Sequence, residues 1–388
     1  MAIRNRFSEL LPEITAWRRD IHENPELLFE TTRTSQFVAD RLAEFGCDEI
    51  VTGIGRTGVV ALIKGRSDSK GKVVGLRADM DALPIEEATG LPYASKTPGV
   101  MHACGHDGHT AMLLGAAKYL AETRNFDGTV AVIFQPAEEG GGGGLEMCKD
   151  GMMERFGIDE VYGMHNWPGR PIGTFAIRPG PFFAATDTFE IVVEGKGGHA
   201  AKPNETVDPI VMAAQCVTAL QTIAARNADP VEQIVVSVTS FESSSKAFNV
   251  IPQSVTLRGT VRTLTPEMRA LGRDRIHDIC THTAAVFGGV AHITYIEGYP
   301  ATVNHEAETK FAAEAATKVA GECDFAPLVM GGEDFSYMLE ERPGAYILMG
   351  NGDGASVHHP EYNFNDEAIP AGCSWWVEMA ETRLGTAQ

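Results

Sequence analysis

Three short apolar segments, each ending in polar side chains, constrain the fold of this chain most. They are residues 72–79, 129–135 and 160–166, and helical patterns of apolar residues lie between or after them. Strands that alternate with helices predict an α/β fold with a mainly parallel sheet. Buried parallel strands carry their chemistry at the carboxyl ends, so Asp79, the pair Glu138-Glu139 and His165 are expected at one edge of that sheet.

The sequence changes character after residue 182. Alternating strand patterns at 187–195, 232–241, 254–263 and 291–299 are interleaved with helical patterns at 207–227 and 266–287. The order βαββαβ predicts a ferredoxin-like α+β unit. We therefore predict a discontinuous catalytic domain, residues 1–182 and 298–388, with residues 183–297 inserted as a second domain.

Charge and hydropathy exclude several functional classes. The 388 residues carry a formal net charge of −20, which disfavours binding to nucleic acid or to an anionic membrane. No apolar run approaches the roughly 18 residues that a membrane span needs. The first residues lack an apolar signal core, so we expect a cytoplasmic protein. Seven cysteines, odd in number and scattered, predict no disulfide framework.

The segment MHACGHDGH, residues 101–109, holds one thiol, three imidazoles and one carboxylate. Helical spacing begins at Thr110, so the segment is predicted to be a loop that leads into a helix. Thiolate, imidazole and carboxylate ligands together suit a first-row transition metal, with zinc as the default and manganese, cobalt or nickel possible. The ligand candidates, for one or two ions, are Cys104, His106, Glu139, His165 and His359. The neighbouring His358 leaves the choice within the His358-His359 pair open.

Adjacent carboxylates at Glu138 and Glu139 follow a buried strand and precede five glycines. Consecutive side chains diverge, so one glutamate can bind metal while the other acts as a general base. The glycine run lacks the Lys-Ser/Thr of a P-loop, which disfavours phosphate binding. His199, in a glycine-rich loop of the inserted domain, is either an ordinary surface residue or a donor to a developing oxyanion.

Seven motifs together resemble the M20 metallopeptidase family, in its amidohydrolase branch of hippurate hydrolases, aminoacylases and auxin-conjugate hydrolases. They are RADMDALP (77–84), MHACGHDGH (101–109), QPAEEGGGG (135–143), GMHNWP (163–168), GKGGHAA (195–201), FNVIP (248–252) and GGEDFS (331–336). The resemblance implies a two-metal catalytic domain with an inserted lid, and the five ligands named above. It implies Glu138 as general base and His199 as oxyanion donor, in many relatives across a dimer interface. It further implies that Asn249 and Arg262 hold the substrate carboxylate and that Asp79 orients a ligand.

The expected reaction is hydrolysis of an N-acyl-L-amino acid to a carboxylic acid and a free amino acid, in a homodimer or higher homo-oligomer. Three alternatives stay open at this point. A dipeptidase is one, because a dipeptide is also an N-acylated amino acid. A metal-independent thiol hydrolase using Cys104 and a non-catalytic metal or amino-acid binder are the others.

Overall fold

The computed structural model describes residues 5–385, which form two compact units. The main unit contains the chain up to Gly180, Val303–Pro327 and the chain from Asp334 onward. The inserted unit contains Pro181–Thr302 and Leu328–Glu333. The predicted insertion, 183–297, lies within the inserted unit, to which the structure adds the short segment 328–333 from later in the chain.

The main unit is built on an eight-stranded sheet of order β1-β2-β4-β3-β5-β16-β6-β15. Its strands are β1 Glu49–Ile54, β2 Gly58–Lys64, β3 Val73–Asp79, β4 Thr129–Gln135, β5 Glu160–Trp167, β6 Phe175–Ile177, β15 Asp324–Phe325 and β16 Gly344–Gly350. The central strands β4, β3, β5 and β16 run parallel, which confirms the predicted α/β class. β2 pairs antiparallel with both β1 and β4. The connection from β1 to β2 is too short for a crossover, so it can join only antiparallel strands.

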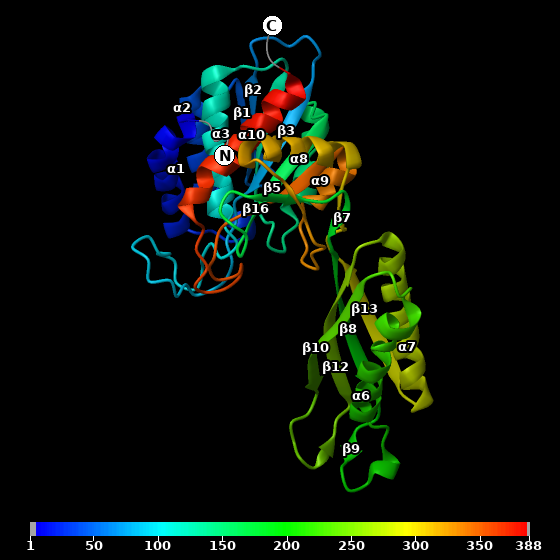
Figure 1. Ribbon diagram of the computed structural model, residues 1–388. Coiled ribbons are helices and arrows are strands. Elements are labelled where there is room, and N and C mark those ends of the chain that lie inside the picture. Colours follow the sequence, from blue (N-terminus) through cyan, green and yellow to red (C-terminus); the bar gives the residue numbers. More distant parts are fainter. Residues whose placement is uncertain (1–4, 386–388) are drawn as a thin grey trace. The chain divides into compact units, whose positions relative to one another are not determined.

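Helices cover the sheet of the main unit. They are α1 Asn5–Glu23, α2 Thr32–Phe45, α3 His106–Thr123, α4 Gly143–Lys149, α5 Met152–Arg155, α8 Glu306–Ala320, α9 Ser336–Glu341 and α10 Ile369–Leu384, with 3-10 turns at Leu28–Glu30 and Asp366–Ala368. α3 packs between α1 and α10 (Figure 1). Alternate residues of β3, namely Val74, Leu76 and Ala78, are buried in the same core. None of the helices in residues 5–385 has both the length and the hydrophobicity of a bilayer-spanning segment.

Helix α3 begins at His106, four residues before the predicted start at Thr110. Gly105 precedes it with a φ of 91°, a left-handed conformation that favours glycine. A Cβ at Gly105 would also lie 2.3 Å from Asn166 Nδ2, so the close approach requires glycine. His106 and His109 therefore lie on the first turn of the helix, three residues apart and on one face.

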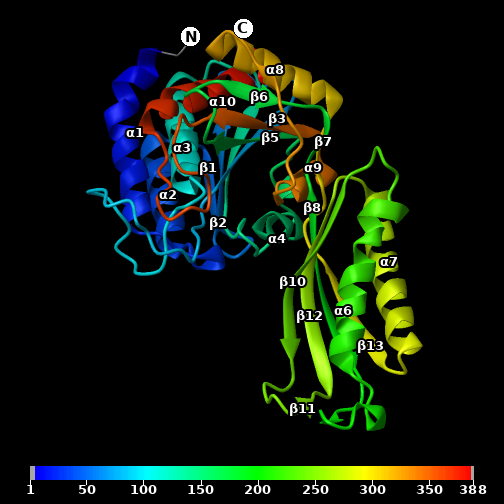
Figure 2. The same ribbon diagram turned by 60° about the horizontal axis from the view of Figure 1, so that its bottom comes forward.

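The inserted unit has the predicted ferredoxin-like order. Its antiparallel sheet, β10-β12-β8-β13, is formed by β8 Ala185–Glu194, β10 Ile234–Ser243, β12 Ser254–Thr263 and β13 Val290–Glu297. α6 Pro209–Leu220 and α7 Pro266–Val286 lie together on one face of this sheet (Figure 2). The remaining short elements are β7 Gly180–Phe183, β9 Gly198–His199, β11 Val250–Ile251, β14 Thr302–Asn304, a 3-10 turn at Pro203–Glu205 and a π-helical turn at Ile223–Asn227.

Candidate metal centre

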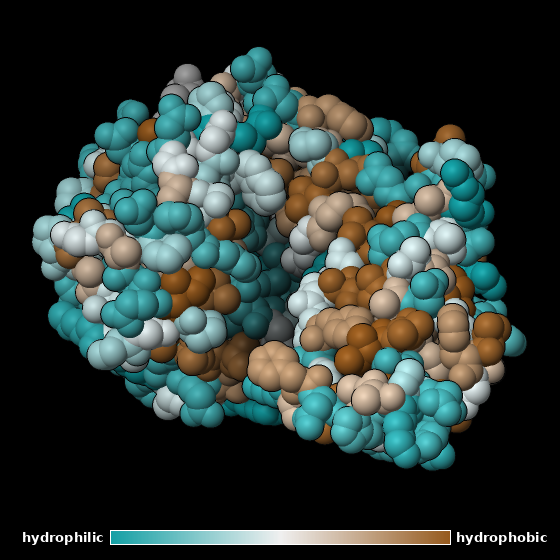
Figure 3. All heavy atoms as spheres, turned by 90° about the horizontal axis from the view of Figure 1, so that it is seen from below, coloured by the Kyte–Doolittle hydropathy of each residue, from teal (hydrophilic) through white to brown (hydrophobic). Residues whose placement is uncertain are grey.

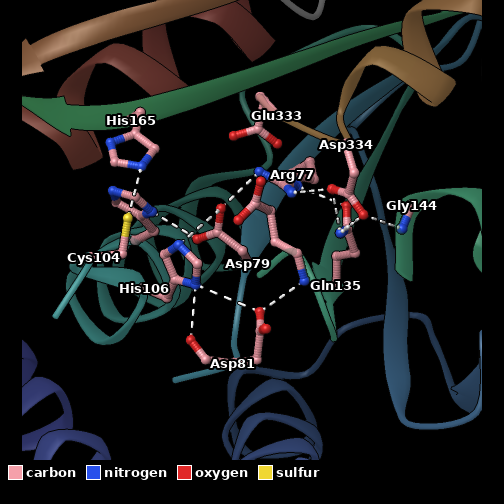
Figure 4. Close-up of polar contacts among 12 residues, drawn as sticks. Arg77, Asp79, Asp81, Cys104, His106, Gln135, Gly144, His165, Glu333 and Asp334 are labelled. Carbon is pink, nitrogen blue, oxygen red and sulfur yellow. Dashed lines mark hydrogen bonds and ion pairs between the residues drawn. The ribbon is translucent and has the colours of Figure 1, made fainter. Parts of the chain in front are cut away.

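Three adjacent parallel strands deliver polar side chains to one edge of the main sheet. Asp79 is the last residue of β3, Glu138 follows β4 by three residues, and His165 lies near the end of β5. β3 pairs with β4 on one side and with β5 on the other, so the predicted convergence at one edge is confirmed. The segment 101–105 and the start of α3 lie at the same edge, which brings Cys104 and His106 to the site (Figure 4).

Two imidazoles are anchored so that each directs one free ring nitrogen inward. His106 donates from Nδ1 to the backbone carbonyl of Asp81 at 2.8 Å. His165 donates from Nδ1 to the carbonyl of Asn166 at 2.6 Å. A carbonyl only accepts, so Nδ1 carries the proton of each neutral ring and Nε2 keeps its lone pair. The Nε2 atom of His165 lies 3.4 Å from Cys104 Sγ. This is the arrangement in which histidine binds metals.

One carboxylate holds the backbone of both adjacent glutamates. The amides of Glu138 and Glu139 donate to Asp81 Oδ1 at 2.9 Å and Oδ2 at 3.1 Å. Ala137, just before them, adopts a left-handed φ of 54°, which turns the chain at the end of β4. Sequence reasoning missed Asp81, although it stands two residues after Asp79 in the same motif, RADMDALP.

The structure corrects the predicted ligand His359 to its neighbour His358. His358 Nε2 lies 3.2 Å from Glu139 Oε1, and the His358 amide donates to the carbonyl of Ala103 at 2.7 Å. Its φ of 66° is unusual for a side chain with a Cβ, as is typical of strained residues at functional sites. His359 is exposed and its Nδ1 accepts from the Glu361 amide at 3.1 Å. Adjacent residues point in different directions, so only one of the pair faces the site.

The residues brought together fit a transition-metal centre. Among the described residues, five groups place one potential ligand atom per member within 4.8 Å of the others. They are Cys104–His106–His165, Asp79–His106–His109, Cys104–Glu139–His358, His106–Glu138–Glu139 and Glu138–Glu333–Asp334. Two buried atoms of these groups, His106 Nε2 and Glu139 Oε1, make no hydrogen bond among the described residues; they lie 3.9 Å from each other, and Glu139 Oε1 lies 3.2 Å from His358 Nε2. Buried polar atoms are normally satisfied, so these two are candidates for a cation.

The charges around the site favour positive charge at its centre. Burial disfavours the charged form of His106, but Asp79 and Asp81 outweigh it and raise the pKa of His106 to about 10. Burial also opposes ionisation of Asp79, yet His106, Arg77 and His109 hold its pKa well below the ordinary value. The pKa of His165 falls to about 3, mainly because of burial and the nearby His109. A neutral His165 with a free Nε2 is in the state that a metal requires.

The Cys104 thiol lies in an environment that suppresses its ionisation. Burial raises its pKa well above the ordinary value, and the carboxylates of Glu139, Glu138 and Asp79 act in the same direction. Reactive cysteines need the opposite, a positive neighbour that stabilises the thiolate. The surroundings of Cys104 therefore disfavour the metal-independent thiol hydrolase and fit a thiol that ionises on binding a cation.

Asp79 makes its histidine hydrogen bond to His109, and its Oδ2 lies 3.8 Å from Nε2 of the predicted ligand His106. Its Oδ1 accepts from His109 Nδ1 at 2.6 Å, and its Oδ2 accepts from Arg77 Nη1 at 2.7 Å. The backbone amide of Asn166 donates to His109 Nε2 at 2.9 Å, so that nitrogen has no lone pair left for a metal. His109 is thus a buried member of the hydrogen-bond network. The predicted ligand His106 donates its hydrogen bond to the Asp81 carbonyl.

The inserted unit contains the remaining predicted site residues, His199, Asn249 and Arg262, and Arg262 lies apart from the other two. His199 on β9 pairs with Val250 on β11, and the Asn249 carbonyl accepts from the Ala200 amide at 3.0 Å. Both His199 and Asn249 are exposed. Arg262 lies at the opposite end of β12, eight residues from its start at Ser254, and eight residues of strand span about 26 Å. Within one subunit, Arg262 and Asn249 cannot hold the same small carboxylate.

Comparison with known proteins agrees with this geometry. Residues 75–382 match the peptidase family M20/M25/M40. The chain is 43% identical to the hippurate hydrolase of Campylobacter jejuni, with 96% of this chain and 97% of the relative covered. It is 39% identical to an N-acetylcysteine deacetylase of Bacillus subtilis (95% and 96% covered) and 40% identical to the IAA-amino acid hydrolase ILR1-like 2 of Arabidopsis thaliana (95% and 85% covered).

The fold comparison leads to the same family. The crystal structure of the Bacillus subtilis YXEP protein, described as a dinuclear metal binding peptidase from the M20 family, superposes with a TM-score of 0.86. It is 36% identical, and the match covers 98% of this chain and 100% of that one. The chain described here belongs to the M20/M25/M40 peptidase family.

Proposed function

We propose that this protein is a cytoplasmic, metal-dependent amidohydrolase that cleaves N-acyl-L-amino acids to a carboxylic acid and a free amino acid. The observation that carries the proposal is the pair Glu138-Glu139, which Asp81 holds beside a set of thiol, imidazole and carboxylate donors. The names of the relatives support the substrate class, since hippurate, N-acetylcysteine and IAA-amino acids are all N-acyl amino acids.

We assign Cys104, His106, Glu139, His165 and His358 as the residues that would hold one or two divalent ions, with zinc as the default and manganese, cobalt or nickel as alternatives. Glu139 is a member of both the group with Cys104 and the group with His106, so its carboxylate could contribute to holding an ion at either group. When bound, such an ion polarises the amide carbonyl and lowers the pKa of water toward about 7.

Glu138 is assigned as the general base. Its backbone is held by Asp81, and its side chain belongs to the group with His106 and Glu139, so its carboxylate lies at the site. In the proposed reaction it takes a proton from the attacking water. The same carboxylic acid then donates that proton to the leaving nitrogen, which prevents the amine from leaving as an anion.

His199 is assigned as a hydrogen-bond donor to the oxyanion. Its Nδ1 accepts from the Ala201 amide at 3.1 Å. An amide can only donate, so the proton of the neutral ring is on Nε2, which is then available as a donor. Preorganised donors of this type stabilise the negative charge that develops on the amide oxygen.

The separation of His199 and Asn249 from Arg262 supports a dimer in which two subunits complete one site. Arg262 can bind a substrate carboxylate in one subunit while His199 and Asn249 act on the site of the other. Large apolar side chains of the inserted unit are exposed, among them Phe248, Val231 and Val286. Figure 3 shows hydrophobic patches that interrupt a largely hydrophilic surface, and exposed patches of this kind mark protein–protein contacts.

A complementation experiment tests the shared site. Glu138→Ala and His199→Ala are each expected to be inactive as pure proteins. If His199 acts on the partner's site, mixed dimers regain one intact site, and random subunit exchange restores up to about a quarter of wild-type activity. Measuring activity after the two variants are unfolded and refolded together checks this. No recovery, with dimers confirmed by light scattering, would contradict action across the interface.

Metal removal tests the reaction class. Chelation is expected to abolish hydrolysis of N-acetyl, N-benzoyl and indole-acyl amino acids, and added Zn²⁺, Mn²⁺ or Co²⁺ should restore it. Elemental analysis should find one or two transition-metal ions per chain. A dipeptide with the same C-terminal residue belongs in the panel, and faster cleavage of the dipeptide would favour a dipeptidase. Chelator-resistant activity would contradict the proposed class.

A further inference from the structure

A buried asparagine next to His165 contacts the Cys104 backbone, His109 and His165. The Asn166 side chain donates from Nδ2 to the Cys104 carbonyl at 2.6 Å and to His109 Nε2 at 3.0 Å. The backbone carbonyl of Asn166 accepts the proton of His165 Nδ1. Asn166 has no solvent-exposed surface, so water cannot replace a lost partner.

Backbone groups fix the direction of each hydrogen bond in this network, because a carbonyl can only accept and an amide can only donate. The Cys104 carbonyl can only accept, so the Nδ2 side of the Asn166 amide must face it, which leaves Oδ1 to accept from the Tyr362 hydroxyl at 2.7 Å. His109 Nε2 accepts from Asn166 and its Nδ1 donates to Asp79. The chain of donors therefore runs one way, from Tyr362 through Asn166 and His109 to the Asp79 carboxylate.

Tyr362 connects this network to the loop that carries His358. Its amide donates to the His359 carbonyl at 2.9 Å, and the His358 amide donates to the carbonyl of Ala103. Tyr362 is also fully buried. The loop of His358 and the loop of Cys104 are thus joined twice, once through Ala103 and once through the Tyr362–Asn166 hydrogen bond.

We propose that Asn166 and Tyr362 are positioning residues that set the Cys104 thiol, His165 and His358 in the geometry required to bind metal. This inference rests on the proposed function, because it concerns the same site. Neither side chain is assigned as a ligand. The Asn166 backbone carbonyl holds the His165 ring, while its side chain holds the Cys104 carbonyl and His109. The Tyr362 hydroxyl keeps the Asn166 side-chain amide in the orientation that makes these two side-chain contacts.

The test uses Co²⁺-loaded protein, because a thiolate–cobalt bond gives a charge-transfer absorption that reports the Cys104 contact directly. Asn166→Leu, which keeps the number of side-chain heavy atoms and removes their hydrogen bonds, is expected to weaken Co²⁺ affinity by about 10–100-fold, the range typical of residues that support metal ligands. The charge-transfer band should shift or weaken. Tyr362→Phe, a milder change that keeps the ring, should act in the same direction with a smaller effect.

The double variant gives an independent check. Asn166→Leu removes the acceptor of the Tyr362 hydroxyl, so adding Tyr362→Phe should cost less affinity in that background than in the wild type. The matched control is Asn304→Leu. Asn304 is also buried, donates from Nδ2 to two carbonyls and accepts a backbone amide, but these contacts lie with Arg178 and Tyr346. This control should lower the melting temperature and leave the cobalt spectrum unchanged.

Two outcomes would overturn the inference. Unchanged affinity and spectrum in both Asn166→Leu and Tyr362→Phe, with a loss of stability like that of Asn304→Leu, would reduce the pair to a structural role while the proposed function stands. If Asn166→Leu does not fold, Tyr362→Phe alone decides by the same readouts. A wild-type protein that binds no Co²⁺ would instead overturn the proposed function, and the inference with it.

Discussion

Glu138→Ala is expected to lower kcat by about 10²–10⁴-fold, the usual contribution of a general acid–base residue. The variant removes the carboxylate that takes the proton from water and later gives it to the leaving nitrogen. The backbone should keep its place, because the contact of residue 138 with Asp81 is made by the amide and not by the side chain. Metal content, measured by elemental analysis, and KM are expected to change little.

Glu139→Ala is the matched control for this prediction, because its amide contacts the same Asp81 carboxylate. Glu139 Oε1 lies 3.2 Å from His358 Nε2 and 3.9 Å from His106 Nε2, so this variant should lose metal as well as activity. Metal content alone therefore distinguishes the role of Glu138 from the role of Glu139. Full activity in Glu138→Ala, or metal loss equal to that of Glu139→Ala, would contradict the role assigned to Glu138.

His358→Ala is expected to have the second large effect, a loss of metal affinity greater than the about 10–100-fold typical of residues that only support ligands. The physical reason is that the His358 ring completes the group with Cys104 and Glu139. Competition with a metal-sensitive chelator measures the dissociation constant. Activity at limiting metal should fall in parallel and recover in part when excess metal is added.

His359→Ala provides the comparison within the same pair of residues. His359 is exposed and its ring accepts from the Glu361 amide of the same loop, so the substitution should stay within about 0.5 kcal/mol in stability and keep the metal. The reverse result, with metal lost in His359→Ala and retained in His358→Ala, would contradict the placement of this loop and restore the ligand first predicted from the sequence.

The start of α3 illustrates where local sequence signals fail. Cysteine, histidine, glycine and aspartate are weak helix formers, so the pattern in residues 104–109 favours a loop until Thr110. The structure begins the helix at His106 because tertiary contacts outweigh propensity there. The Asp81 carbonyl binds the His106 ring, and Asp79 binds the ring of His109 one turn later. Both partners come from a strand end some thirty positions earlier in the chain.

The sequence by itself determined the α/β class, the inserted βαββαβ unit and the edge of the sheet where Asp79, Glu138 and His165 meet. These follow from local properties, namely the period of apolar residues and the rule that parallel strands end at one edge. The thiol and the first imidazole of the site were equally visible, because Cys104 and His106 lie within one nine-residue segment rich in metal-binding side chains.

Only the tertiary structure decided which of several nearby residues of the same type takes each role in the site. His358 rather than His359 faces the site, Asp81 rather than Asp79 holds the glutamates, and His109 has its ring nitrogens committed to Asp79 and Asn166. The direction of a single side chain depends on backbone φ and on partners distant in sequence, such as the Ala103 carbonyl for His358. Which of two nearby residues faces the site does not change the period of apolar residues in the sequence. It is decided by the contacts that each side chain makes in the folded protein.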